Sequence, residues 1–378
     1  MLSSSPERIQ RRDTSMSLER VPEADEPAYE EWNDDEDLLE EQGLYRGSYN
    51  RLVLLYTLAP LTTVIVLALS AALPFIVYHY HDAENDYPYS VFLPYPLPEI
   101  LIPAALFIFT HCLRPVLFTL PTLVVPESFA TTLVSTALST ILTIVGRMVA
   151  LILLLIRPYA AYDTPTWHDP AFVRIWWAGL GWAAAEGIVA VAQGYAGLEL
   201  YRDVLVPSST ATPRAATPDS TEHQPSSSTE RTPLLPRLSS GSTIPIPKPL
   251  DASVVLTDPG TELDNDLDQL LALKARDDLE DVLGIPLVYI PPFIPPLQRV
   301  NAVLLSLGLF LLLGAALFVS RLAATSLVGV AAAAHVLLSA LHAPGVLPRV
   351  GLPSAAFVGA VVSLGVLFAG LGVWGGVS

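Results

Sequence analysis

Seven long runs of apolar residues divide the chain, and shorter or more polar segments separate them. A helix rises ~1.5 Å per residue, so about 20 apolar residues cross the ~30 Å hydrocarbon core of a bilayer. Each run meets or nearly meets that length. The pattern therefore predicts an all-α, polytopic transmembrane helical bundle of about seven spans, over residues 52–77, 98–125, 130–156, 175–200, 300–319, 323–341 and 353–377.

The second run is the irregular one, because Pro103, Pro115 and Pro121 fall within it. Proline removes a helix hydrogen bond and bends or breaks the helix. We expect one broken helix here. The alternative is a pair of re-entrant half-helices, which would reduce the number of crossings to six.

Two polar segments set the organisation of the chain. Residues 1–50 lack apolar periodicity and are predicted to be a disordered, acidic N-terminal tail. Residues 201–299 are rich in Ser, Thr and Pro and are predicted to be a disordered cytoplasmic linker. The linker joins a four-span membrane half, residues 51–200, to a three-span half, residues 300–378.

One part of the linker, residues 262–283, regains helical periodicity. Thr261 is a plausible N-cap and Gly284 a plausible stop. The polar face of this amphipathic helix is acidic, which disfavours binding to an anionic membrane. We expect the helix to dock on the cytoplasmic surface of the protein through one apolar face, formed by Leu263, Leu267, Leu270, Leu271, Leu279 and Leu283.

Composition supports the membrane class and excludes some partners. Hydrophobic residues make up 52% of the chain, and its mean hydropathy is +0.48. The net charge is −17, with 11 acidic and no basic residues between positions 23 and 41. An acidic chain binds nucleic acid poorly, so no nucleic-acid partner is expected. The apolar runs make the lipid bilayer the expected partner. Cys112 is the only cysteine, which excludes an intramolecular disulfide.

The arginines that flank the spans indicate an orientation. Positive residues favour the cytoplasmic side of a membrane protein. With a cytoplasmic N-terminus, five flanking arginines lie on the cytoplasmic side and three on the other. We therefore expect a cytoplasmic N-terminus and linker, with Arg46, Arg51, Arg202, Arg299 and Arg349 inside and Arg157, Arg174 and Arg321 outside.

Several polar residues fall near the middle of the spans, where they are costly and usually face the protein interior. Counting residues along each helix brings them to similar depths. One interpretation is a mid-membrane functional site. The other is that Glu186 neutralises Arg147 or Arg114 and the pair fixes helix packing. The predicted cluster contains His111, Arg114, Arg147, Glu186, Gln193 and His335.

Hydroxyl residues share one face of the third run with Arg147. Either they form hydrogen bonds between helices or they line a cavity. The residues are Thr132, Thr136, Ser139, Thr140 and Thr143.

These residues leave three classes of function open. Our leading prediction is an endomembrane protein with a structural, adaptor or transport-related role. One alternative is an intramembrane enzyme, in which Glu186 and His335 activate a water or hold a metal. The other alternative is a solute or proton carrier that uses Glu186 and Arg147. No nucleotide loop, HExxH or G-x-S-x-G motif is present, so no cofactor is predicted.

The segments GLGWAAAE and AAAAHVLLSALH resemble the Abi/CAAX-type intramembrane proteases, in which Glu and His on separate helices form the catalytic site. The resemblance implies catalytic roles for Glu186 and His335. That family has a double Glu with a downstream Arg, whereas Gly187 follows Glu186 here.

The linker also contains a candidate sorting signal, ERTPLLP. Glu230, Leu234 and Leu235 fit the acidic dileucine pattern and resemble signals that clathrin adaptors read on endosomal and vacuolar cargo. We therefore expect an endosomal or vacuolar membrane, with the ER or Golgi as the alternative. The acidic tail, the linker and QGYAGLELYRD resemble those of uncharacterised fungal multi-pass membrane proteins, a resemblance that implies no activity.

Overall fold

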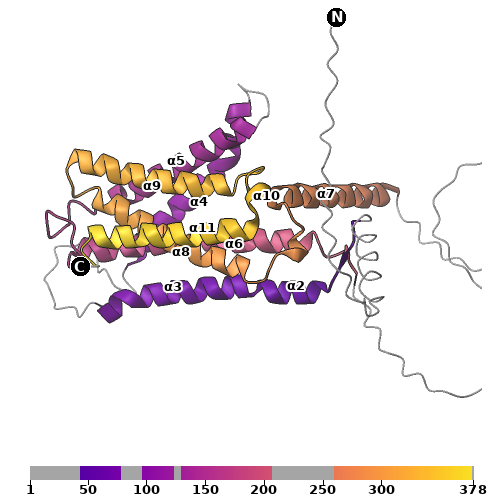
Figure 1. Cartoon of the computed structure of the whole chain (residues 1–378), viewed down its shortest axis with the longest axis horizontal. Coiled ribbons are helices and arrows are strands. Elements are labelled where there is room, and N and C mark those ends of the chain that lie inside the picture. Colours follow the sequence, from indigo (N-terminus) through magenta and orange to yellow (C-terminus); the bar gives the residue numbers. More distant parts are fainter. Residues whose placement is uncertain (1–42, 78–95, 123–128, 207–258, 377–378) are drawn as a thin grey trace, which may run out of the picture. The chain divides into compact units, whose positions relative to one another are not determined.

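The computed structural model describes residues 43–77, 96–122, 129–206 and 259–376 (Figure 1). Within these ranges, seven helical segments are long and apolar enough to cross a membrane. The prediction of an all-α, seven-span bundle is therefore confirmed. The first span begins and the last span ends at opposite ends of the bundle, as an odd number of crossings requires.

The described elements follow the predicted runs closely. The first span consists of two helices that meet at Thr57, whose hydroxyl donates to the carbonyl of Leu54. The spanning helices are α2 (Tyr49–Tyr56) with α3 (Leu58–Val77), α4 (Leu97–Thr122), α5 (Phe129–Leu153), α6 (Pro170–Glu199), α8 (Ile294–Ala315), α9 (Arg321–Leu341) and α11 (Leu352–Val373). The shorter or non-spanning elements are β1 (Tyr45–Arg46), β2 (Leu205–Val206), α7 (Pro259–Leu283), η1 (Leu287–Tyr289) and α10 (Leu347–Val350).

The second span is one continuous helix. α4 runs from Leu97 to Thr122 with Pro103, Pro115 and Pro121 inside it. The expectation of a broken helix, and the alternative of two re-entrant halves, are therefore wrong. Neighbouring helices can support a transmembrane helix at a proline, and α4 packs along both α5 and α6.

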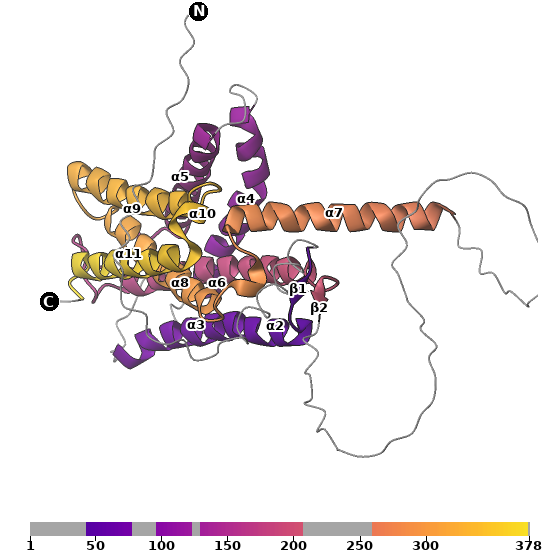
Figure 2. The same cartoon turned by 45° about the vertical axis from the view of Figure 1, so that its right-hand side comes forward.

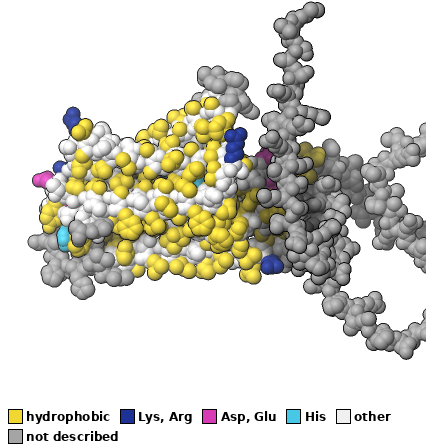
Figure 3. All heavy atoms as spheres, in the orientation of Figure 1, with side chains coloured by type: hydrophobic (Ala, Val, Ile, Leu, Met, Phe, Trp, Pro, Cys, Tyr) yellow, Lys and Arg dark blue, Asp and Glu magenta, His cyan; other side chains and the backbone are white. Residues whose placement is uncertain are grey.

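α6 and α8 form the centre of the bundle. α6 packs against α3, α4 and α8, and α8 packs in turn against α3, α9 and α11. Both central helices are largely buried, whereas only a small share of α3 and α9 is buried within the bundle. Figure 3 shows hydrophobic side chains covering the visible face between its ends, where charged side chains are seen. An apolar outer surface of this kind suits contact with lipid.

The bundle has two ends, which we call the α7 end and the Glu99 end. The α7 end is where α8 and α11 begin and α6 ends. The Glu99 end is where α4 and α6 begin and α11 finishes. At the α7 end, the last turns of α4 and the first turns of α5 lean away from the remaining helices (Figures 1 and 2).

Glycine allows close approach of backbones at two central contacts. A Cβ on Gly181 of α6 would lie 2.3 Å from the carbonyl oxygen of Ile100 in α4. A Cβ on Gly308 of α8 would lie 2.6 Å from the backbone nitrogen of Leu367 in α11. Small residues at helix interfaces permit such packing in membranes, so these two positions fix how close α6 and α8 come to their neighbours.

Gly308→Ala should destabilise the bundle, because the added methyl group meets backbone atoms that cannot rotate away. We expect a loss of about 1–3 kcal/mol, the usual cost of overpacking. The matched control is Gly365→Ala in α11, where nothing lies within 4 Å of the added Cβ. That change should be neutral or stabilising by up to about 1 kcal/mol. Unfolding of the purified protein by SDS in mixed micelles measures both, and equal effects would contradict the packing argument.

A fully buried ion pair joins α4 to α6 at the Glu99 end. Arg174 Nε donates to Glu99 Oε1 at 2.9 Å, and both side chains have no exposed surface. Arg174 Nη2 also donates to the carbonyl oxygen of Leu154 at 2.6 Å, just beyond the end of α5. One guanidinium therefore ties three consecutive membrane segments together. Sequence reasoning assigned Arg174 to the interface and did not identify Glu99.

Glu99→Gln or Arg174→Gln should each cost about 3–5 kcal/mol, because each leaves the other charge buried without its partner. The double replacement should cost less than the sum of the two single changes. Asp163→Asn is the control: Asp163 pairs with Arg157 at 3.8 Å, but its side chain is fully exposed. An exposed pair contributes only about 0–1 kcal/mol. SDS unfolding of the four variants tests this, and strictly additive losses would show that Glu99 and Arg174 are not coupled.

The linker helix is present as α7 and begins two residues before the predicted N-cap Thr261. Gly284 follows it with a positive φ of 76°, as a helix stop requires. Tyr201 donates its hydroxyl to Glu280 at 2.7 Å, so the C-terminal part of α7 docks on the segment after α6. Leu270 and Leu271 remain exposed, and the start of α7 extends away from the bundle (Figure 2).

Much of the predicted linker, with the sorting signal Glu230, Leu234 and Leu235, lies outside the described residues, as does most of the acidic tail.

Candidate functional site

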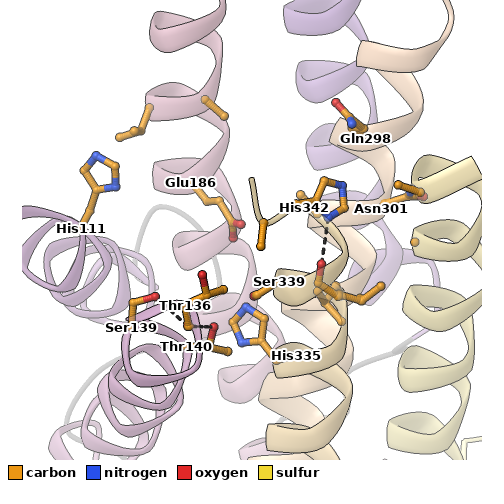
Figure 4. A pocket seen from close by; sticks show the side chains of 18 of the residues that line it. His111, Thr136, Ser139, Thr140, Glu186, Gln298, Asn301, His335, Ser339 and His342 are labelled. Atoms are coloured by element: carbon orange, nitrogen blue, oxygen red, sulfur yellow. Dashed lines mark hydrogen bonds between the residues drawn. The ribbon is translucent and has the colours of Figure 1, made fainter. Parts of the chain in front are cut away.

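A polar cavity of about 460 Å³ lies between α4, α5, α6, α8, α9 and α11. The parts of these helices that line it belong to the half of the bundle nearer the α7 end. Figure 4 shows Glu186 of α6 and His335 of α9 projecting into the space between the helices. Five residues of the predicted cluster line the cavity: His111, Arg114, Glu186, Gln193 and His335.

A second, much smaller chamber of about 20 Å³ adjoins the cavity toward the middle of the bundle. Arg147, the sixth residue of the predicted cluster, lines it together with Trp182 and Thr143. Five residues line both spaces: Phe107, His111, Arg114, Glu186 and His335. A chamber of this volume holds about one water molecule. The structure thus brings all six predicted residues to one connected site.

Arg147 is the most deeply buried charge of the site, with only 1% of its surface exposed. Its Nη1 lies 3.3 Å from Nδ1 of His335, and its Cζ lies 4.5 Å from the centre of the Trp182 ring. Because arginine only donates, Nδ1 of His335 must accept, and the proton of the neutral imidazole then sits on Nε2. The one donor of His335, Nε2–H, therefore stays available for another group.

Glu186 is held by α8 and not by an arginine. The Ser306 hydroxyl donates to Glu186 Oε2 at 3.0 Å. Within the described residues, no ion pair joins Glu186 to Arg147 or Arg114, so the expected direct pairing is wrong. Glu186 still acts electrostatically on Arg147 at longer range. The reason for the difference is lateral position: the Arg147 guanidinium lies against α9 and Trp182, whereas Glu186 turns toward α8.

Four hydroxyl residues on one face of α5 line the site. Thr136, Ser139, Thr140 and Thr143 each donate to a carbonyl three or four residues earlier in α5. Thr136, Ser139 and Thr140 line the cavity, and Thr143 lines the chamber. Of the two interpretations of this face, the cavity lining fits these contacts.

Further polar residues complete the cavity toward the α7 end. Arg299 and Gln298 come from the first turns of α8, and His342 follows α9. Sequence reasoning treated Arg299 as a flanking residue only. Its place seven residues before Ser306, on the same face of one helix, is the signal that could have assigned both residues to the site.

Three arginines and one carboxylate line the connected site: Arg114, Arg147, Arg299 and Glu186. Across the described parts of the chain, none of the three arginines has a carboxylate within ion-pair distance. With neutral histidines, the lining therefore carries a net charge of about +2. In a low-dielectric environment, charge that is not balanced nearby is costly.

Comparison with protein-family models, curated proteins and solved structures gives no match for this chain. Among the residues that the structure describes, no group of three or more His, Cys, Asp or Glu side chains could hold a metal ion.

Proposed function

We propose that this protein is a transport-related membrane protein that binds a polar solute in the cavity. The observation that carries the proposal is a polar cavity of about 460 Å³ that reaches mid-membrane residues from one end of a seven-span bundle. Ligand sites of small molecules commonly have this size. Polar and charged side chains that meet at mid-membrane depth around such a space more often serve a pathway than packing alone.

The one-sided arrangement of the bundle supports a carrier over an open channel. Between the site and the Glu99 end, the core is filled by large side chains, including Trp177, Phe310 and Trp374. Trp374 also donates from Nε1 to the carbonyl of Leu311 at 2.9 Å. The buried Glu99–Arg174 pair lies at that end. A site at mid-depth with access from one side is typical of one state of an alternating-access carrier.

An intramembrane hydrolase is the second candidate. The supporting observation is that Glu186 and His335 both line the chamber, which has room for about one water. A carboxylate and an imidazole beside a bound water are the groups that general acid–base hydrolysis uses. The two candidates differ in outcome, because a carrier releases its solute unchanged and a hydrolase releases cleaved products.

Orientation and compartment belong to the same proposal. The arginine bias favours a cytoplasmic N-terminus, which puts the α7 end and the mouth of the cavity in the cytoplasm. The acidic dileucine motif favours an endosomal or vacuolar membrane, reached through clathrin adaptors.

If the cavity holds water, a cysteine at Ser339 should react with a membrane-impermeant methanethiosulfonate reagent added from the cytoplasmic side. The background is Cys112→Ser, because Cys112 is exposed. Ser339 lines the cavity. Leu337→Cys is the matched control: it lies two residues away on α9, is 56% exposed on the outer surface and does not line the cavity. A lipid-facing thiol stays protonated and unreactive.

The expected result is a labelling rate at least about tenfold faster for Ser339→Cys than for Leu337→Cys, measured by mass spectrometry on sealed vesicles of known orientation. Equal and slow labelling of both cysteines would show that the cavity is not filled with solvent and would contradict the carrier proposal. Fast labelling only from the opposite side would keep the cavity and reverse the proposed orientation.

The sorting motif makes a separate prediction. Leu234→Ala with Leu235→Ala should move the protein from endosomal or vacuolar membranes to another compartment, because adaptors bind both leucines. Leu270→Ala with Leu271→Ala is the control: that pair also follows an acidic residue by four positions, but it lies on a helix. Fluorescence microscopy of tagged variants gives the answer, and an unchanged distribution of the first variant would make ERTPLLP a chance match.

A further inference from the structure

The charge balance of the site indicates what kind of solute it takes. Arg114, Arg147 and Arg299 face a single carboxylate, Glu186, around one connected space. Arg147 is 1% exposed, and its Nε has no hydrogen-bond partner among the described atoms. Buried charges in membrane proteins are normally paired or serve a pathway. Arg114 is exposed and Arg299 is half-buried, whereas Arg147 lies at the buried inner end of the site. An excess of positive charge around a space that reaches a buried arginine therefore favours an anion as the missing partner.

We infer that the solute of this cavity carries a phosphate monoester group, bound between Arg114, Arg299 and the Arg147–His335 pair. The inference rests on the proposed binding function and specifies its substrate class. A phosphate monoester carries about −1.5 to −2 charges at neutral pH, which matches the net charge of about +2. Guanidinium groups also fit phosphate better than a spherical ion, because they donate two parallel hydrogen bonds.

Volume decides where the anion sits. The chamber of about 20 Å³ holds a single water and is too small for a phosphate group. The cavity of about 460 Å³ holds a phosphate with an organic group attached. A water bound in the chamber would then join the deep donors to the anion. Two of these donors have no partner among the described residues, namely Arg147 Nε and Trp182 Nε1.

The remaining lining suits a polar headgroup. Gln193 and Gln298 contribute amides, and Thr136 and Ser139 contribute oxygen atoms. The His335 ring adds a donor at Nε2, because its Nδ1 accepts from Arg147. The same chemistry is found in a water-soluble phosphate ester and in the headgroup of phosphatidic acid, and the experiment separates these two sources.

Glu186 makes the inference sharply testable, because its charge opposes an anion. Replacing it by Gln keeps an oxygen that accepts from Ser306 and removes one negative charge. Anion binding should then become stronger. Replacing an arginine by Gln removes a positive charge, and binding should become weaker. A merely structural role for these residues would weaken binding in both cases.

The experiment uses the full chain, purified in a non-ionic detergent for soluble probes and reconstituted in nanodiscs for lipid probes. Binding of glycerol 3-phosphate is measured by calorimetry, with glycerol as the uncharged control. The unfolding temperature is compared between nanodiscs that contain phosphatidic acid and nanodiscs that contain phosphatidylserine, an anionic lipid without a phosphate monoester. The variants are Arg114→Gln, Arg299→Gln and Glu186→Gln. Arg157→Gln at the Glu99 end, outside the cavity, is the control.

We expect Arg114→Gln and Arg299→Gln to weaken glycerol 3-phosphate binding about tenfold or more, the range of a lost charge-assisted hydrogen bond. Glu186→Gln should tighten it severalfold, and Arg157→Gln should leave it unchanged. Stabilisation by phosphatidic acid alone, with the same dependence on the arginines, supports a lipid headgroup as the source. Binding that is insensitive to Arg114 and Arg299, weaker binding in Glu186→Gln, or no response to either phosphate probe would overturn the inference. If Ser339→Cys is labelled normally in that case, the cavity and its proposed binding function still stand.

Discussion

The cost of a charge in the hydrocarbon layer governs this structure, and the chain meets that cost in two different ways. At the Glu99 end, Arg174 lies 2.9 Å from Glu99 and also donates to the Leu154 carbonyl, so the charge is satisfied within the protein. In the other half of the bundle, Arg147 has an imidazole, an aromatic ring and distant Glu186 as neighbours. The first arrangement holds α4, α5 and α6 together at the Glu99 end. The second keeps a polar space between them.

Close helix packing makes this contrast possible. Gly181 lets α6 approach the backbone of α4 near Glu99, and Gly308 lets α8 approach α11. These contacts hold one part of the bundle together while the last turns of α4 and the first turns of α5 lean away (Figure 1). The cavity lies where that separation leaves room, and both polar and apolar side chains form its wall. Small residues therefore determine where the helices touch.

The sequence was sufficient for the fold class, the seven spans and six residues of the site, because these follow from position along the membrane normal. It did not assign Gln298, Arg299 or His342 to the site. Depth in the membrane does not say which neighbouring helix a side chain faces. Depth alone therefore paired Arg147 with Glu186, although Arg147 turns toward α9 and Glu186 toward α8. Depth also could not identify the Glu99–Arg174 pair, since Arg174 lies near a helix start and looked like an interface residue. The continuity of α4 depends on support from α5 and α6, and local proline chemistry alone predicted a break.

α4 connects the closed end to the cavity, and this places a constraint on any transport cycle. Glu99 lies in its first turn, whereas His111 and Arg114 lie more than three turns later and line the cavity. Opening the Glu99 end by moving α4 would break the ion pair with Arg174, and both charges would then need water or new partners. A ligand shifts such an equilibrium only by its difference in affinity between the two states. An anion that binds Arg114 on α4 and the Arg147–His335 pair on α5 and α9 contacts helices on both sides of the cavity. Its binding energy can therefore depend on how α4 is placed, which is the property that coupling between the two ends requires.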